Sequence, residues 1–239
     1  MRVKDVEPYI SRAVQSTFLL GGYTIVLDDG STDGTGEQLE ILAERNRSIL
    51  EIVSCQHQMM DEGRDRTLLL RYALDQDPKW IFTLDGDEEL PSETCYRILH
   101  AVEEAPPEVT VLSFIFACMW GENEFFRANS HLPAMERLFR VTDGLADYEF
   151  KSVYPSNMHC GTVPKIITGE RKLLNAFIKY WGYESDEAIR RKLEFYQTND
   201  PGHFEVIRQT VEERKRGSKM QFSDDLDARV LGIHGSVLY

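Results

Sequence analysis

Two pairs of acidic residues follow apolar runs, and their carboxylates are the side chains most able to do chemistry in this sequence. Asp28 and Asp29 end the run YTIVLDD, and Asp85 and Asp87 follow the apolar part of WIFTLDGDEEL. A carboxylate at a strand end can accept hydrogen bonds from the N–H groups of a base, and carboxylate oxygens suit Mg²⁺ or Mn²⁺. The two pairs therefore predict a site for a nucleotide and a divalent cation.

The segment DDGSTDGTGEQLE allows two other interpretations. It matches the spacing of an EF-hand calcium loop at Asp29, Ser31, Asp33, Gly34 and Glu40. An EF-hand requires a preceding amphipathic helix and an apolar residue at position 8, whereas this chain has the strand-like YTIVL and Gly36. A strand-to-helix turn that binds nothing, with Asp33 as helix cap, is the other alternative. The second acidic pair, also at a strand end, favours the nucleotide site.

The second acidic pair has the chemistry of a metal site. Gly86 is expected to let Asp85 and Asp87 turn toward one point. An ion held by one or two carboxylates together with substrate phosphates neutralises a diphosphate leaving group. A D-x-D pair alone is weak evidence, because acidic pairs at solvated helix starts are common.

Strand and helix patterns alternate up to about residue 120. Helices are expected at 7–20, after Asp33, at 66–74 and at 92–105, and strands at 23–29, 50–55, 80–90 and 108–120. This order predicts an α/β fold with a doubly wound, mostly parallel mixed sheet flanked by helices, in which ligands bind at the carboxyl ends of the strands.

The rest of the chain has weaker patterns. Short strands are expected at 136–141 and 165–168, and helices at 184–198 and 203–216, which gives a helical C-terminal segment. We expect a nucleotide-binding half at 1–120, an acceptor-side half of the same domain at 121–182, and C-terminal helices with a tail at 183–239.

Composition excludes several classes of protein. The 239 residues carry a formal charge of −13, which argues against binding nucleic acid or an anionic membrane. The four cysteines include no C-x-x-C pair, so a zinc knuckle is not expected. The apolar runs are shorter than the about 20 residues that span a bilayer, and MRVKDVEPYI lacks a signal-peptide profile. A cytoplasmic protein is expected, with docking to the inner face of a membrane left open.

The motifs together resemble a known family. VLDDGSTDGT followed by WIFTLDGDEEL is similar to the inverting family 2 glycosyltransferases of the GT-A fold. RLFR, at residues 137–140, resembles a strand motif of members that act on lipopolysaccharide cores, and IKYWGYESDEAIRRKLEFYQTNDPGHF resembles the closing segment of many members. The resemblance covers roughly residues 1–205.

The resemblance implies a metal-dependent inverting transfer from a nucleoside-diphosphate sugar, expected to be a UDP-sugar, to a hydroxyl of a glycan or lipid-linked acceptor. It implies that Asp28, with Asp29 beside it, reads the base, and that Asp85 and Asp87 engage ribose, diphosphate and Mn²⁺ or Mg²⁺, with Asp87 as the direct ligand. Arg66 lies where members place a basic residue near the nucleotide. Alternatively, the arginines of this segment form the solvated face of a helix.

Three departures from the family pattern affect the expected site. The first strand begins inside its motif at MRVKD, so one sheet strand is expected to be short. Members often carry a metal-binding His before Gly-Tyr, where this chain has Tyr180-Trp181, so water or His159 is the expected third metal contact.

The third departure concerns the catalytic base. In MHCGTVP, Cys160 replaces an acid found in relatives. The remaining candidates for the base are Asp147, Glu149 and Glu136.

Two rival functions follow from the same residues. A nucleotidyltransferase shares the sheet and the acids but usually has a Gly-rich, basic phosphate loop near its start, which this sequence lacks. A catalytically decayed nucleotide-sugar-binding protein is favoured by the short first strand, by Tyr180 and by the missing base motif.

Overall fold

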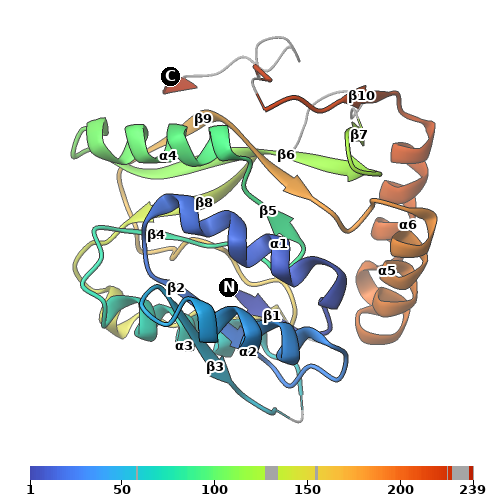
Figure 1. The fold of residues 1–239 in the computed structure, drawn as a ribbon, viewed down its shortest axis with the longest axis horizontal. Helices are drawn as coiled ribbons and strands as arrows, with labels where there is room; N and C mark the ends of the chain where they lie inside the picture. The colour runs from blue at the N-terminus through green and yellow to red at the C-terminus, as the bar shows by residue number, and fades with distance from the viewer. Residues whose placement is uncertain (58, 127–133, 154–155, 225, 228–236, 239) are drawn as a thin grey trace.

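The computed structural model describes residues 1–57, 59–126, 134–153, 156–224, 226–227 and 237–238. It has a mixed α/β fold in which helices pack against two sheets (Figure 1). Within the described residues, no helix is long and apolar enough to cross a membrane.

The first sheet is parallel and forms the base of the candidate site. It consists of β1 (Arg2–Val3), β2 (Thr24–Asp28) and β3 (Leu50–Ser54), in the order β1-β2-β3. All five residues of β2 are buried, because this apolar, β-branched strand lies between two neighbours. The crossovers run through α1 (Glu7–Thr17) with the 3₁₀ turn η1 (Phe18–Leu20), and through α2 (Thr35–Arg45).

The second sheet is mixed and is centred on β6 (Val109–Trp120). The antiparallel β8 (Ala134–Arg140) lies on one side of β6, and the parallel β9 (Glu170–Tyr180) lies on the other. The shorter strands are β4 (Trp80–Phe82), β5 (Glu88–Glu89), β7 (Glu124–Phe126), β10 (Lys219–Gln221) and β11 (Val237–Leu238). A parallel bridge between Arg2 and Asp85 joins the edges of the two sheets.

Two expected strands differ in the structure. The strand expected at 80–90 is two strands, β4 and β5, because the segment between them turns at the acidic pair. The prediction of a strand at 165–168 is wrong. The Ile167 N–H closes a turn onto the Pro164 carbonyl, and Gly169 has φ +115°, so β9 begins only at Glu170.

The helices follow the predicted order. α3 (Glu62–Leu74) begins earlier than expected because the Asp61 side chain caps it by accepting the Arg64 N–H. α4 (Ser92–Glu104) packs on β9, and α5 (Asp186–Asn199) and α6 (Pro201–Arg216) pack against each other at one side of the molecule (Figure 1). Apolar side chains of α4, β6, β8 and β9 form a buried cluster between these layers.

Gly63 allows the start of α3 to approach the segment around residue 150 closely. A Cβ at Gly63 would lie 2.6 Å from the Ser152 nitrogen and 2.8 Å from the Phe150 oxygen. Both atoms are backbone, so they cannot yield as the end of a flexible side chain would.

We expect Gly63→Ala to lower the free energy of unfolding by about 1–3 kcal/mol, because an overpacked contact must displace backbone. Gly22→Ala is the matched control, since a Cβ at Gly22 meets nothing within 4 Å. Urea unfolding of both variants measures the difference. Equal stability of the two variants would contradict this packing.

Candidate functional site

The two acidic pairs lie at one rim, on either side of β1. In the register of the sheet, Val3 pairs with Asp28, and the Asp29 N–H donates to the Val3 carbonyl at 3.1 Å. On the other side of the strand, Arg2 bridges to Asp85. The structure therefore brings the two predicted clusters together, because the carboxyl ends of adjacent parallel strands share one edge of a sheet.

Asp85 lies between two guanidinium groups. Its Oδ1 accepts from Arg66 Nη2 at 2.9 Å, and its Oδ2 accepts from Arg137 Nη2 at 3.0 Å. Both arginines are buried, with 6% and 2% of their surface exposed. Burial alone would raise the pKa of Asp85, but Arg137 and Arg66 outweigh it and hold the pKa below its usual value. Arg66 thus faces the acids and does not form a solvated helix face.

Glu88 fixes the turn that carries the acidic pair. Its Oε2 accepts the Asp85 N–H at 3.0 Å, and its Oε1 accepts from Arg137. Gly86 lies within this turn, where a Cβ would come 2.8 Å from Val3 Cγ1. Close approach to β1 is therefore the reason for glycine here, and not the backbone flexibility expected from the sequence.

Asp87 contacts a buried phenol and a lysine. The Tyr180 hydroxyl hydrogen-bonds the Asp87 carboxylate, and Lys192 Nζ donates to the same hydroxyl oxygen. Burial raises the pKa of Asp87, and the nearby Lys192 ammonium opposes that rise. The pKa of Lys192 is itself lowered by burial. A chain of contacts thus runs from the ammonium through the phenol to the carboxylate.

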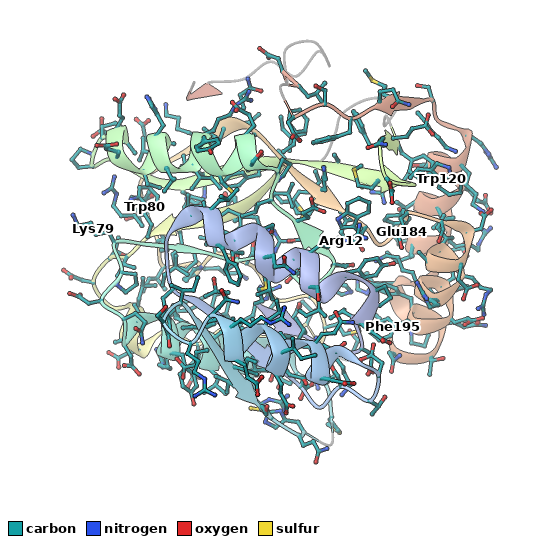
Figure 2. The ribbon with its side chains drawn as sticks, in the orientation of Figure 1. Arg12, Lys79, Trp80, Trp120, Glu184 and Phe195 are labelled. Carbon is teal, nitrogen blue, oxygen red and sulfur yellow. The ribbon has the colours of Figure 1, made fainter. Side chains whose placement is uncertain are left out.

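The segment after β9 is anchored to the first half of the chain. The Trp181 N–H donates to the Asp87 carbonyl at 2.9 Å, and Trp181 Nε1 donates to Glu89 Oε2 at 3.0 Å. The guanidinium of Arg12, labelled on α1 in Figure 2, lies 4.4 Å from the centre of the Trp181 ring. These contacts fix the position of the adjacent Tyr180 against Asp87.

Asp29 belongs to a second ionic network at the same rim. Its carboxylate accepts from Arg2 at 3.2 Å and contacts His57 Nδ1 at 2.9 Å. Asp65, which is fully buried, also accepts from Arg2, at 2.8 Å, and from Arg64 Nε at 2.8 Å. The two carboxylates are therefore already matched by two guanidinium groups.

Asp28 has one carboxylate oxygen committed to its own turn. Oδ1 accepts from the Ser31 N–H at 2.9 Å and from the Ser31 hydroxyl at 2.6 Å. The side chain is therefore held rigidly at the end of β2. No hydrogen bond to Oδ2 occurs among the described residues, so this oxygen is the one with capacity for a ligand.

The three predicted base candidates differ in their surroundings. Glu136 precedes Arg137 on β8, where the register with β6 is irregular, and the Glu136 carboxylate pairs with Arg171 at 2.7 Å. Asp147 and Glu149 are exposed and flank Tyr148, whose carbonyl accepts from Arg71.

The position of Asp147 and Glu149 follows from the length of α3. Arg71 lies nine residues after Glu62, or about 13 Å further along the helix. Glu62 is the end of α3 that faces the rim, since Glu62 Oε1 accepts from Arg66 at 3.2 Å. This distance concerns Asp147, whereas Glu149 directly precedes Phe150, whose N–H donates to Thr67 Oγ1 at 2.9 Å near that end of α3. The choice of base among Asp147, Glu149 and Glu136 therefore stays a prediction.

His159 groups with residues other than the acidic pair. Its Nε2 lies 3.1 Å from Asp200 Oδ2, and its ring stacks on Tyr196. The metal-binding groupings of the described residues place His159 with Asp200 and His203, not with Asp85 and Asp87. The role of His159 as the third contact of that metal therefore stays a prediction that these groupings do not support.

Three residues of the rim had no role in the sequence prediction. Arg137 and Lys192 lie in motifs that were recognised, RLFR and the closing segment, but neither pattern says which way a side chain points. Glu88 directly follows the acidic pair. Only 2% of its surface is exposed, and the segment LDGDEE, with four acids in six residues, gave no reason to expect this burial.

An apolar cavity of about 360 Å³ lies at the other end of the strands. It is lined by the first residues of β2 and by β4, including Thr24, Ile25 and Trp80, and by apolar side chains of α3 and α4. Figure 2 shows Trp80 at the opposite end of the molecule from Phe195 of α5. The cavity extends from there toward the acidic rim, since Arg2 and Arg66 also line it.

Comparison with known proteins decides the family. Residues 4–160, more than half of the chain, match the family model described as Glycosyl transferase family 2. The chain belongs to this family. It carries a glycosyltransferase domain, in agreement with the resemblance seen in the motifs. No curated protein gives a significant match to the sequence of this family 2 member.

Several solved structures are similar at low identity. S. aureus TarS 1–349 is 16% identical with a TM-score of 0.45, covering 90% of this chain and 68% of that one. TarS 1–349 in complex with UDP-GlcNAc is 16% identical with a TM-score of 0.43, covering 89% and 70%. The mannosyltransferase PcManGT from Pyrobaculum calidifontis, in complex with GDP-Man and Mn²⁺, is 13% identical with a TM-score of 0.41, covering 89% and 68%.

Glu88 gives the rim a pH-dependent stability. Burial raises the pKa of Glu88 to about 8 even though Arg137 opposes the rise. Because this value lies above the ordinary glutamate pKa of 4.5, the folded state binds the proton more tightly than the unfolded chain does. The resulting stabilisation is complete below about pH 4.5 and is lost as the pH rises toward 8.

We expect Glu88→Gln to remove this dependence, so the free energy of unfolding should fall less between pH 5 and pH 8 than it does in the wild type. Urea titrations of both proteins at pH 5 and pH 8 measure this fall in the free energy of unfolding. An identical fall in the variant and the wild type would show that Glu88 does not titrate in this window.

Proposed function

We propose that this family 2 member transfers a sugar from a nucleoside-diphosphate donor, with UDP as the expected nucleotide, to a hydroxyl of a glycan or lipid-linked acceptor. The observation that carries the proposal is the joining of the two acidic pairs at one rim across β1. The rim provides Asp28 near a base and Asp85 and Asp87 near a diphosphate. The rim lies at the carboxyl ends of parallel strands, which is where such sheets bind nucleotides.

The residues at the rim fit a divalent ion. Asp85 and Asp87 face Arg66, Arg137 and Lys192, whereas burial raises the pKa of Glu88 to about 8, so the cations exceed the charged acids by one near pH 7 before any diphosphate binds. A bound diphosphate would leave an excess of negative charge. Mg²⁺ or Mn²⁺ would offset that excess and stabilise the leaving group.

Asp87 is the residue that would hold the ion. Both oxygens of Asp85 accept from guanidinium groups, whereas Asp87 contacts only a phenol and, more distantly, an ammonium. The raised pKa of Asp87 means that its anionic form lacks full solvation, which a cation would restore. We therefore propose that the role of Asp85 is to hold the guanidinium groups of Arg66 and Arg137 in position.

The buried guanidinium groups have unused donors that suit a phosphate. Arg66 Nε, Arg137 Nε and Arg137 Nη1 are buried with no hydrogen-bond partner among the described residues. A buried donor without a partner is costly, so such groups commonly await a ligand or water. Inversion would follow from in-line attack by the acceptor hydroxyl, with a base within hydrogen-bond reach of that hydroxyl.

A second candidate function is nucleotide-sugar binding without transfer. It is favoured by one observation, the ion pair of Glu136 with Arg171, which commits the carboxylate of that candidate base. The two functions differ in turnover. Incubation with a panel of UDP- and GDP-sugars and Mn²⁺ should yield slow release of the nucleotide from one donor if the protein is a transferase. Binding without release, even with candidate acceptors, would support the second function.

We expect Asp87→Asn to abolish Mn²⁺-dependent UDP binding and donor turnover, because the variant loses the charge that holds the ion. Calorimetry with UDP, with Mn²⁺ and with EDTA, measures the binding. Glu136→Gln is the matched control, since the Glu136 carboxylate pairs with Arg171 and the substitution should leave UDP binding unchanged. Full activity of the Asp87 variant would refute the assignment.

We expect Lys192→Met to weaken donor binding about tenfold or more, because a charge-assisted contact of about 1.5–3 kcal/mol is lost beside the diphosphate. The same change at Lys215, an exposed lysine of α6 that pairs with Asp186, is the control. The Kd for UDP with Mn²⁺ is the readout. A weakening shared by both variants would indicate a general loss of positive charge and not a role of Lys192.

A further inference from the structure

A second group of potential metal ligands lies beside the acidic rim. His159 Nε2 is 3.1 Å from Asp200 Oδ2, and His203 Nδ1 is 2.8 Å from the same oxygen. The three ligand atoms lie within 4.8 Å of one another. They come from three places in the chain: a loop, the residue between α5 and α6, and the first turn of α6.

We propose that His159, Asp200 and His203 bind a zinc-type divalent ion. Two imidazole nitrogens and one carboxylate oxygen are a donor set that zinc favours, whereas Mg²⁺ prefers oxygen ligands alone. Three protein ligands leave the fourth tetrahedral position open. The side chains of His159 and His203 are 39% and 47% exposed, so water or a small ligand can reach that position.

The separations in the cluster are close to those that such an ion requires. Ligands about 2.0–2.2 Å from a tetrahedral zinc lie about 3.4 Å from one another. The two nitrogen-to-oxygen distances, 3.1 and 2.8 Å, are slightly shorter than this. A small outward movement of the two exposed rings would therefore admit the ion.

The surroundings of the cluster hold it in place. The Asp200 side chain is 3% exposed. Asp200 lies directly before Pro201, the residue at which α6 begins. The His159 ring stacks on Tyr196 with its centroid 5.9 Å away and an angle of 10° between the planes. His159 also has φ +64°, a strained backbone conformation for a residue other than glycine, and such strain is typical of positions held for a function.

The charge of Asp200 distinguishes this cluster from the one around Asp29. Asp29 and Asp65, which group with His57, already pair with Arg2 and Arg64. Among the described residues, no arginine or lysine forms an ion pair with Asp200, and the two histidines contact its carboxylate. A buried carboxylate that no guanidinium or ammonium group contacts gains most from a cation.

The site is distinct from the proposed Mg²⁺ or Mn²⁺ position at Asp87, and it does not depend on the proposed transfer. Its expected consequence is a tie between the α5–α6 pair and the loop at residues 156–160. The next residue of that loop, Cys160, donates its N–H to Glu62 Oε2 at 2.9 Å. A metal at the cluster would therefore brace the loop against the end of α3 that faces the rim.

The test is metal binding by the full chain, freed of metal beforehand, with Zn²⁺ measured by calorimetry and Co²⁺ by its visible absorption. We expect one equivalent of Zn²⁺, a Co²⁺ spectrum of tetrahedral intensity, and a higher melting temperature with Zn²⁺. His203→Ala and Asp200→Asn should weaken Zn²⁺ binding by more than the about 10- to 100-fold typical of losing an outer-shell partner. His159→Asn should do the same, and asparagine tolerates the positive φ at that position.

His100→Ala, at an exposed histidine of α4, is the control and should bind Zn²⁺ as the wild type does. His203→Ala alters an exposed side chain, so its melting temperature without metal should match the wild type and show that the fold is intact. Absence of Zn²⁺ binding by the wild type would overturn the proposal. Unchanged affinity in the His203, His159 and Asp200 variants would overturn it equally.

Discussion

The carboxylate of Asp85 lies between two buried guanidinium groups that come from opposite halves of the chain. Arg66 belongs to α3, which follows the first parallel sheet, and Arg137 belongs to β8 of the mixed sheet. Removing one member of a buried ion pair leaves an uncompensated charge and typically costs about 3–5 kcal/mol. The two halves are therefore joined at the point where the acids meet, and the geometry of the rim depends on this contact.

The electrostatics of the rim differ from those of the whole chain. The protein carries a formal charge of −13, yet the rim places Arg66, Arg137 and Lys192 among its acids. Burial keeps these charges from being screened by water, so each acid is matched by a specific cation. The arrangement leaves donors for an anion and one carboxylate, Asp87, that no guanidinium contacts. That combination suits a metal-bridged diphosphate better than it suits a free one.

The sequence predicted the first half of the fold and the meeting of the acids, because parallel strands place their carboxyl ends at one edge regardless of the details of packing. The apolar run before Asp28 and its turn were therefore sufficient for β2. The same reasoning could not choose among the base candidates. The register between β6 and β8 is irregular at Arg137, so strand alternation could not show that Arg137 reaches the acids while Glu136 pairs with Arg171.

Other parts of the site depend on contacts distant in the sequence. Lys192 reaches Asp87 only because α5 folds back beside β9, and no local pattern encodes that packing. His159 was predicted as a ligand from its residue type, but its neighbours Asp200 and His203 are more than forty positions further along the chain. Gly86 was correctly seen as necessary, yet the reason is the space left by Val3. Local patterns thus identified residue types, and tertiary packing assigned their partners.

A double-mutant cycle between Asp85→Asn and Arg137→Met, with the free energy of UDP binding as the readout, tests the central claim most directly. If the Asp85 carboxylate positions Arg137 for the diphosphate, the two changes should be coupled by about 1–3 kcal/mol, since residues in one ion-pair network are not additive. Additive effects of the two substitutions, within about 0.5 kcal/mol, would contradict it.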